Sequence, residues 1–254
     1  MTVKTLAQSS PQAHVVKEEH IEKVVADQSL LPFYRFFPFV FQFFISLLMR
    51  VGLFLFTKFE VKGLENLTNL KPGIIIASNH LSELDPIIIG SVLPLFSPLR
   101  PAFYTSRGKG LYQRPSWRRP FYGGLLFKLL GAYPVIIGAH DYSKSLTAHA
   151  RIVKHGGTMV IFPEGSRSKD GQMREGKGGV MYLSDITAAP IVPVAISGVF
   201  QMTAKKFFSR KAHITLTFGK PLSALEILPH NKRDFHEYTL AAQTVMAEIH
   251  KLKK

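Results

Sequence analysis

A histidine and an aspartate lie close together between two runs of isoleucine. In the segment ASNHLSELDP, residues 77–86, four residues separate His80 from Asp85. If the chain turns back there, the carboxylate accepts a hydrogen bond from one imidazole nitrogen and leaves the other nitrogen free to take a proton. The spacing therefore allows His80 to act as a general base that Asp85 orients, although such a pair alone is weak evidence for catalysis. Asp85 also directly precedes Pro86, which is typical of a residue that caps the start of a helix.

A second polar segment, FPEGSRS at residues 162–168, follows another apolar run. It would present the Glu164 carboxylate beside the Arg167 guanidinium. A guanidinium suits bidentate binding of phosphate, and a carboxylate suits a hydroxyl. The alternative is a surface turn in which Gly165 takes a positive φ and the two charges form a solvated ion pair.

The absence of cysteine narrows the chemistry. The 254 residues contain none, which excludes disulfides, thiolate metal sites and cysteine nucleophiles. No third ligand stands at a usual spacing from His80 and Asp85, so we expect no metal site.

Short apolar runs alternate with helical patterns from about residue 61 onward. Strands are expected at 73–78, 101–105, 132–137, 158–162, 191–196 and 212–218, and helices at 86–95, 120–130, 143–154, 179–187 and 232–252. This alternation predicts an α/β fold with a mostly parallel sheet flanked by helices. Because ligands bind beyond the carboxyl ends of parallel strands, His80 and Glu164 should meet at one edge of the sheet.

Taken in order, the pair His80-x4-Asp85, the segment FPEGSRS and the segment IVPVAI at residues 191–196 resemble the glycerolipid acyltransferase family. Its best-known members are the 1-acylglycerol-3-phosphate acyltransferases of phospholipid synthesis. The resemblance runs from about residue 73 to residue 198. It implies that His80, oriented by Asp85, takes a proton from an acceptor hydroxyl as that oxygen attacks a thioester carbonyl.

The resemblance also implies roles for the remaining site residues. Those that would bind the glycerol phosphate of the acceptor are Glu164, Gly165, Arg167, Lys177 and Gly179, the last two from a Lys-x-Gly element. Those that would shape the side of the acyl donor are Val192, Pro193 and Val194.

The chain departs from the family pattern at two positions. Members commonly carry an arginine, associated with the acceptor phosphate, at a place that falls near Ile137 in this chain, and no arginine follows here until Arg151. Without it, the task would fall to Lys144, Arg167 or Arg174. The phenylalanine that usually precedes the Lys-x-Gly element is replaced here by Gly176.

The resemblance implies that a lysophosphatidate-type acceptor is converted to phosphatidic acid, with acyl-CoA or acyl carrier protein as the donor and no cofactor. The chain has neither a cysteine nor a G-x-S-x-G elbow, so we expect direct transfer without an acyl-enzyme. Two alternatives stay open: another lysophospholipid or glycolipid acceptor, and a non-catalytic, membrane-peripheral lipid-binding protein. The intact pair of His80 and Asp85 argues against the second.

Residues 36–56 form the most apolar segment. As a helix they would be roughly 31 Å long, enough to cross a bilayer. Gln42, Ser46 and Arg50 fall on one stripe of that helix, which favours a helix that lies in the membrane interface or packs its stripe on the globular part. A spanning helix and a buried core helix are the alternatives. We expect a polar leader at 1–30, a membrane-associated helical segment at 31–60 and an acyltransferase domain at 61–254, with monotopic attachment to the cytoplasmic face of a membrane.

The formal net charge is +15, which favours an anionic partner. Residues 86–140 contain no acidic residue and interleave basic and aromatic side chains, among them Arg100, Phe103 and Tyr104. Such a stretch suits anionic lipid or single-stranded nucleic acid, and the apolar segment favours membrane lipid and no nucleic acid. The alternative is a solvated basic face with buried aromatic rings. Nothing in the pattern indicates an oligomeric state.

The first prediction follows from the role of His80 as the base. The substitution His80→Ala should lower turnover by roughly 10²–10⁴-fold while the fold stays intact. Steady-state kinetics with circular dichroism as the control for folding test it, and activity near that of the wild type would overturn the assignment.

Overall fold

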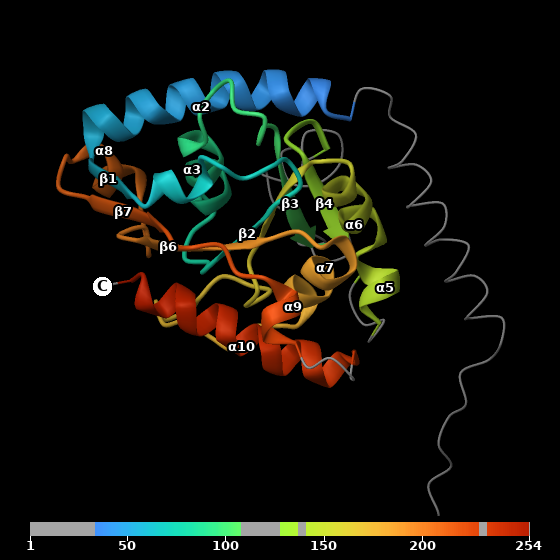
Figure 1. Cartoon of the computed structure of the whole chain (residues 1–254). Helices are drawn as coiled ribbons and strands as arrows, with labels where there is room; N and C mark the ends of the chain where they lie inside the picture. The colour runs from blue at the N-terminus through green and yellow to red at the C-terminus, as the bar shows by residue number, and fades with distance from the viewer. Residues whose placement is uncertain (1–33, 108–127, 137–140, 229–232, 254) are drawn as a thin grey trace, which may run out of the picture. The chain divides into compact units, whose positions relative to one another are not determined.

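The computed structural model of the chain describes residues 34–107, 128–136, 141–228 and 233–253. These residues form a seven-stranded sheet with helices on both of its faces (Figure 1). In their order across the sheet, the strands are β1 (Lys58–Lys62), β7 (His213–Phe218), β6 (Ile191–Ser197), β2 (Ile75–Ser78), β5 (Thr158–Ile161), β3 (Ala102–Arg107) and β4 (Ala132–Val135). Neighbouring strands are parallel except β6 and β7. The predicted fold class, α/β with a mostly parallel sheet, is confirmed.

Alternate residues of the central strands face opposite helical layers. Ile75 and Ala77 of β2 join a buried cluster with α6 (Thr147–Lys154), α7 (Gly179–Thr187) and α10 (Phe235–Lys251). Ile74 and Ile76 join the cluster on the other side, with α2 (Phe36–Phe56) and α3 (Asp85–Val92). Both faces of the sheet are therefore buried, which is why the strands read as continuous apolar runs.

Several predicted helix ends were wrong, each for a local reason. The helix predicted at 143–154 is two helices, α5 (Tyr142–Ser145) and α6, divided at Leu146. Helix α3 ends at Val92 because Leu93 precedes Pro94 and takes an extended ψ of 133°. Helix α10 begins at Phe235, after Asp234 accepts a hydrogen bond from the Glu237 N–H at 2.9 Å. The helix predicted at 120–130 lies almost wholly outside the described residues.

The expectation that Asp85 caps a helix is also wrong. The capping position is held by Leu84, and Asp85 is the first residue of α3. Its carboxylate turns away from the helix and accepts backbone hydrogen bonds from Leu81 and Ser82. The Asp85 side chain therefore binds the loop before the helix and does not cap the helix.

The short elements were not predicted. They are the strand β1, the 3₁₀ helix η1 (Leu64–Leu67) and the helices α8 (Ala204–Phe208) and α9 (Ala224–Ile227). The helices are each one turn or little more, which is too short to show a 3.6-residue period. Strand β1 is a mostly exposed strand at the edge of the sheet with charged residues at alternate positions, as is common at sheet edges.

The polar stripe of α2 packs on the rest of the protein. This was one of the two arrangements that the sequence favoured, the other being a helix that lies in the membrane interface. The amide of Gln42 donates to the carbonyl oxygens of Ala102 at 2.6 Å and Leu130 at 2.9 Å, and its oxygen accepts from the Ala102 N–H at 3.0 Å. Arg50 donates to the carbonyl oxygens of Ser91 at 2.6 Å and Leu93 at 2.7 Å. The stripe therefore fastens α2 to β3 and to the end of α3.

Arg100 belongs to this attachment, and its expected place on a basic surface was wrong. The side chain is buried and donates to the hydroxyl of Ser46 at 2.5 Å and to the carbonyl oxygen of Leu93 at 3.2 Å. Its burial lowers the pKa of the guanidinium from the ordinary value. Phe103 and Tyr104 are likewise buried in the core. Most of the basic and aromatic residues expected to face a membrane in this stretch lie outside the described residues.

The outer side of α2 is apolar and exposed. The helix is long and apolar enough to cross a membrane, judged by length and composition. Its most exposed residues are Leu48 at 75% and Phe54 at 83% of full exposure. The further exposed apolar side chains of the helix are Phe36, Phe37, Phe41, Phe44, Leu47, Val51 and Leu55. A helix with one side bound to protein and the other side apolar is suited to contact with lipid.

The attachment of α2 gives the second prediction. Gln42→Ala leaves the buried N–H and carbonyl groups of Ala102 without their partner, so the free energy of unfolding should fall by about 2–4 kcal/mol. Leu48→Ala, on the exposed side of the same helix, is the matched control and should change it little. Urea unfolding in detergent micelles measures both, and equal effects would contradict the proposed attachment.

Candidate active site

The site lies where two neighbouring parallel strands end. His80 follows β2 and Glu164 follows β5, and the strands are in register with Ala77 opposite Ile161. The backbone N–H of His80 donates to Oε1 of Glu164 at 3.0 Å. The predicted meeting of these two residues at one edge of the sheet is confirmed.

The imidazole of His80 and the carboxylate of Asp85 form a hydrogen bond, with 2.8 Å between Nδ1 and Oδ2. The same oxygen accepts from the backbone N–H groups of Leu81 at 2.6 Å and Ser82 at 2.8 Å. Because a carboxylate only accepts, the neutral imidazole carries its proton on Nδ1 and leaves Nε2 with a free lone pair. Nε2 makes no hydrogen bond to any described residue, and the His80 side chain keeps 17% of its exposure.

The Asp85 side chain is fully buried, in contrast to its partner. Its second oxygen, Oδ1, has no hydrogen-bond partner among the described residues. A carboxylate shielded from water in this way attracts a neighbouring imidazolium more strongly than a solvated one would. The buried carboxylate therefore holds the His80 ring through Nδ1.

The aromatic ring of Phe162 lies flat against the imidazole. The ring centroids are 4.0 Å apart and the planes differ by 19°. Stacking on one side and Asp85 at Nδ1 together fix the direction in which Nε2 points. Phe162 was not singled out from the sequence, although it opens the FPEG segment and so stands at the end of the strand next to His80.

Glu164 is buried, and both of its oxygens accept backbone hydrogen bonds. Oε1 takes the N–H of His80 and Oε2 takes the N–H of Arg174 at 3.1 Å. The side chain thus joins the loop of the histidine to the loop that carries Arg174. No ion pair joins it to Arg167 in the described structure, contrary to the arrangement expected from FPEGSRS.

The Arg167 guanidinium instead pairs with Glu83, at 2.8 Å between Nη1 and Oε1. Glu83 lies between His80 and Asp85 in the sequence, so this guanidinium borders the loop of the proposed base. The Arg174 guanidinium donates to the carbonyl oxygen of Arg167. The two arginines are thereby held together on the exposed side of the Glu164 loop.

Gly165 has a φ of +70°, as the surface-turn interpretation required. A side chain at this position would begin 3.0 Å from Nζ of Lys177. The lysine therefore lies over the glycine and brings a third cation to the rim of the site. Hydrogen bonds from the Gln172 N–H and the Ser168 hydroxyl lower the pKa of Asp170 in the adjoining turn.

The comparison with known proteins agrees with this geometry. The family model described as Acyltransferase matches residues 58–197, a range that runs from β1 to β6 and contains both loops of the site. The chain belongs to the acyltransferase family.

Individual relatives are named as acyltransferases of one kind. The acyltransferase is 24% identical over 192 residues to "Probable 1-acyl-sn-glycerol-3-phosphate acyltransferase" of Mycoplasma pneumoniae, covering 74% of this chain and 68% of the relative. It is 30% identical over 158 residues to human 1-acyl-sn-glycerol-3-phosphate acyltransferase beta, covering 60% of this chain and 51% of the relative. The match therefore spans about half the length of the human protein.

A solved structure shares the fold. The crystal structure of the 1-acyl-sn-glycerophosphate acyltransferase PlsC from Thermotoga maritima covers 94% of each chain with a TM-score of 0.56 and 19% sequence identity. At this identity the likeness concerns the fold.

The other residues predicted for the site of the acyltransferase lie deeper. Gly179 begins α7, and a Cβ there would lie 3.1 Å from Leu146. Val192, Pro193 and Val194 are buried in β6. Val194 pairs with Ser78 at the end of β2, so β6 supports the strand that leads to His80. Their roles toward acceptor and donor stay predictions.

The side chain of Asn79 also joins the segment before His80 to β6, which was not predicted from the sequence. Its amide donates to the carbonyl oxygen of Ile196 at 2.9 Å and accepts from the Ile196 N–H at 2.8 Å. These two bonds take the place of the backbone hydrogen bonds that would join β2 to β6 at this position. They hold the backbone directly before His80 in place.

The structure explains why Gly176 stands where the family usually has a phenylalanine. A Cβ at this position would lie 2.7 Å from Cγ of Met246 in α10. The backbone of Gly176 also donates to Gln243 at 3.2 Å and accepts from it at 2.8 Å. Helix α10 thus occupies the space that a phenylalanine side chain would need. The other departure, at Ile137, lies outside the described residues.

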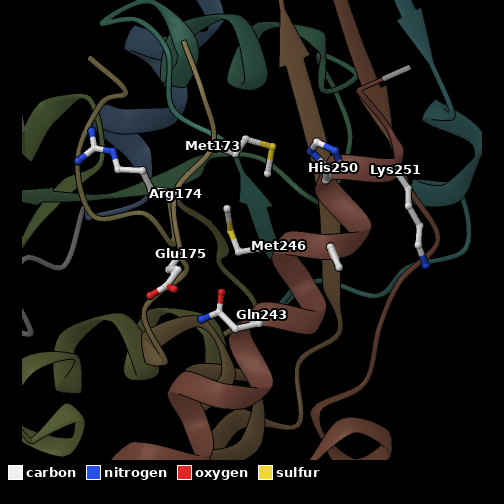
Figure 2. Close-up of a pocket in the computed structure, with 8 residues that line it drawn as sticks. Met173, Arg174, Glu175, Gln243, Met246, His250 and Lys251 are labelled. Carbon is white, nitrogen blue, oxygen red and sulfur yellow. The ribbon is translucent and has the colours of Figure 1, made fainter. Parts of the chain in front are cut away.

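A surface pocket lies beside the Glu164 loop, between Met173 and Arg174 on one side and Met246 and His250 of α10 on the other (Figure 2). His80 does not line it, so the reaction is not placed there. Among the described residues, no group of three His, Asp or Glu side chains could hold a metal ion.

The third prediction concerns Glu164. In Glu164→Gln one acceptor oxygen becomes an amide donor, which cannot accept the N–H of Arg174. Amide exchange of the 172–178 segment should speed up, and kcat should fall more than the KM of the acceptor rises, because the loop of His80 loses its tie. Hydrogen exchange by mass spectrometry and steady-state kinetics measure both.

Glu175→Gln is the matched control for this variant, since it makes the same change in an exposed side chain of the same loop. If Glu164→Gln raised only the KM of the acceptor and left exchange unchanged, Glu164 would be a ligand of the substrate and not a positioning residue.

Proposed function

We propose that the chain is a lysophosphatidate acyltransferase. It transfers a fatty acyl chain from a thioester to the free hydroxyl of 1-acylglycerol 3-phosphate and so forms phosphatidic acid. The observation that carries the proposal is the pair of His80 and buried Asp85, with Nδ1 occupied and Nε2 open. The names of the relatives supply the substrate class.

The reaction follows from the geometry of this pair. Nε2 of His80 takes the proton of the acceptor hydroxyl while the oxygen attacks the thioester carbonyl carbon. Asp85 stabilises the imidazolium that forms, and Phe162 keeps its plane fixed. The tetrahedral intermediate then expels the thiolate, which receives the proton back from His80. The acyl chain moves directly to the acceptor, and either acyl-CoA or acyl carrier protein serves as the donor, without a cofactor.

The phosphate of the acceptor would bind at the cationic rim. Arg167, Arg174 and Lys177 border the loops of His80 and Glu164. The Arg167 guanidinium is held by Glu83 in the free protein, so a phosphate competes with this carboxylate for the same group. Such competition sets the affinity for the acceptor, because a dianionic phosphate gains more from a guanidinium than an exposed carboxylate does.

The fourth prediction tests this proposal. Purified protein is assayed with labelled acyl-CoA or acyl carrier protein and a panel of acceptors that includes lysophosphatidate, other lysophospholipids and a glycolipid. Lysophosphatidate should be preferred. Arg167→Ala should raise its KM about tenfold or more, and Glu83→Gln should lower it, because the competing charge is removed.

Arg151→Ala is the matched control, since Arg151 is exposed in the last turn of α6, before the start of β5 and not in the loops at the carboxyl ends of the strands. Preference for an acceptor without a phosphomonoester would instead support the glycolipid or lysophospholipid alternative. Absence of transfer to every acceptor, with His80 and Asp85 intact, would support the non-catalytic lipid-binding alternative.

We further propose that the protein is monotopic and bound to the cytoplasmic face of a membrane through α2. Gln42 and Arg50 are engaged with Ala102, Ser91 and Leu93 along the inner side of the helix. A helix that crossed the bilayer would have to carry these attached parts into the hydrocarbon, where unsatisfied polar groups cost several kcal/mol each. In a monotopic arrangement, only the exposed apolar side of α2 enters one leaflet, and the polar inner side stays bonded to the protein.

The fifth prediction addresses this topology. Tags at the two ends of the chain should show the same protease accessibility in sealed vesicles, because both ends lie on one side of the bilayer. Lysis of the vesicles with detergent is the control for tag integrity. Opposite protection of the two tags would establish a spanning helix.

A further inference from the structure

The short helix α8 packs against the carboxyl-terminal end of α2 (Figure 1). The ring centroids of Phe208 and Phe56 are 4.8 Å apart, and those of Phe207 and Phe56 are 6.4 Å apart. Arg210 donates from Nε to the carbonyl oxygen of Leu55 at 2.7 Å. These contacts hold α8 in place at the end of the exposed apolar side of α2.

Phe208 continues that apolar side beyond the helix itself. Its side chain is 58% exposed although the ring touches Phe56. An exposed aromatic ring next to an exposed apolar helix suits the boundary between acyl chains and headgroups.

The charges of the α8 segment, residues 203–211, are of one sign. The last turn of α2 contains no basic residue. Lys58 of β1 is exposed just after it, and the other cations at this end come from the α8 segment. They are Lys205, Lys206, Arg210 and Lys211, all exposed. The sequence has no Asp or Glu from residue 186 to residue 225. On the adjoining strand β1, Glu60 is paired with Lys62 at 3.3 Å and with His213 at 3.1 Å.

From this juxtaposition we propose that the α8 segment, residues 203–211, binds the phosphates of anionic lipids at the bilayer surface while Phe208 enters the acyl-chain boundary. The inference rests on the proposed membrane function of α2. It adds the chemistry of the lipid, because α2 alone offers apolar contact and does not distinguish anionic from neutral headgroups. The segment would fix the carboxyl-terminal end of α2 at the level of the headgroups.

An acidic carrier protein is the other partner that a basic surface could attract. The bilayer fits better, because the exposed ring of Phe208 is continuous with the exposed apolar residues of α2.

The test measures partition of the full-length protein onto vesicles. Vesicles of phosphatidylcholine alone are compared with vesicles that also contain phosphatidylglycerol. The triple variant Lys205→Gln, Lys206→Gln and Lys211→Gln should bind the anionic vesicles about 100-fold more weakly, since each lysine near an anionic surface contributes about fivefold. Binding to the neutral vesicles should stay unchanged. Arg210 is left in place because it caps α2 through Leu55.

A second triple variant is the matched control. Lys220→Gln, Lys251→Gln and Lys253→Gln remove the same charge near the other end of β7, where Gly219 lies against Leu252. Partition of this variant onto anionic vesicles should change little. Equal losses in the two triples would mean general attraction by net charge, and no loss in the first triple would also overturn the proposal.

The ring of Phe208 provides an independent measurement. The chain has one tryptophan, Trp117, so Trp117→Phe combined with Phe208→Trp places a single fluorophore in α8. Its emission should shift to the blue and be quenched by brominated lipid in anionic vesicles. Bound protein without such quenching would show that α8 stays off the bilayer.

Acyl transfer in detergent micelles separates this inference from the proposed function. The first triple variant should keep wild-type kcat with acyl-CoA, because none of its lysines belongs to the site. Loss of affinity for acyl carrier protein with unchanged partition would assign α8 to that protein and overturn the lipid proposal. A wild type that partitions as expected but transfers no acyl group would overturn the proposed function and leave the lipid contact standing.

Discussion

The site depends on one carboxylate that bonds to the backbone of the histidine and of a neighbouring loop. Glu164 accepts the backbone N–H of His80 with one oxygen and that of Arg174 with the other. Two loops at the ends of neighbouring strands are thereby held at a fixed separation. This tie places the arginine-bearing loop beside the backbone of His80, whose ring is then oriented by Asp85 and Phe162. A buried carboxylate that accepts two backbone hydrogen bonds holds both loops firmly. If either loop moved away, its N–H group would lose a charged acceptor that no other group replaces.

A single short helix links the site to the apolar surface. Asp85 is the first residue of α3, and at the other end of that helix the carbonyl oxygens of Ser91 and Leu93 accept from Arg50 of α2. The carboxylate bonded to His80 is therefore separated from the exposed apolar helix α2 by two turns of α3. If α2 lies in a membrane as proposed, α3 is the element that sets the distance of His80 from the bilayer.

The buried polar groups of α2 show why an apolar helix can be part of a globular chain. Gln42, Ser46 and Arg100 form a network with the start of β3, and the outer residues keep an unbroken apolar side. Each buried polar atom of such a network that lacks a partner reduces the stability that the network contributes. In this one, the Nε of Arg100 has no partner among the described residues, which leaves the guanidinium bonded through its two terminal nitrogens.

The sequence by itself determined the α/β class, the strands that carry the site, and the pairing of His80 with Asp85. Those inferences rest on apolar runs of strand length and on groups a few residues apart, which the local backbone brings together whatever the rest of the chain does. The tertiary structure decided which distant partner each polar side chain takes. Glu164 binds backbone and not Arg167, Arg167 binds Glu83, and Arg100 is buried under α2. These choices depend on the order of strands in the sheet and on the packing of α2, and spacing along the chain carries no information about either.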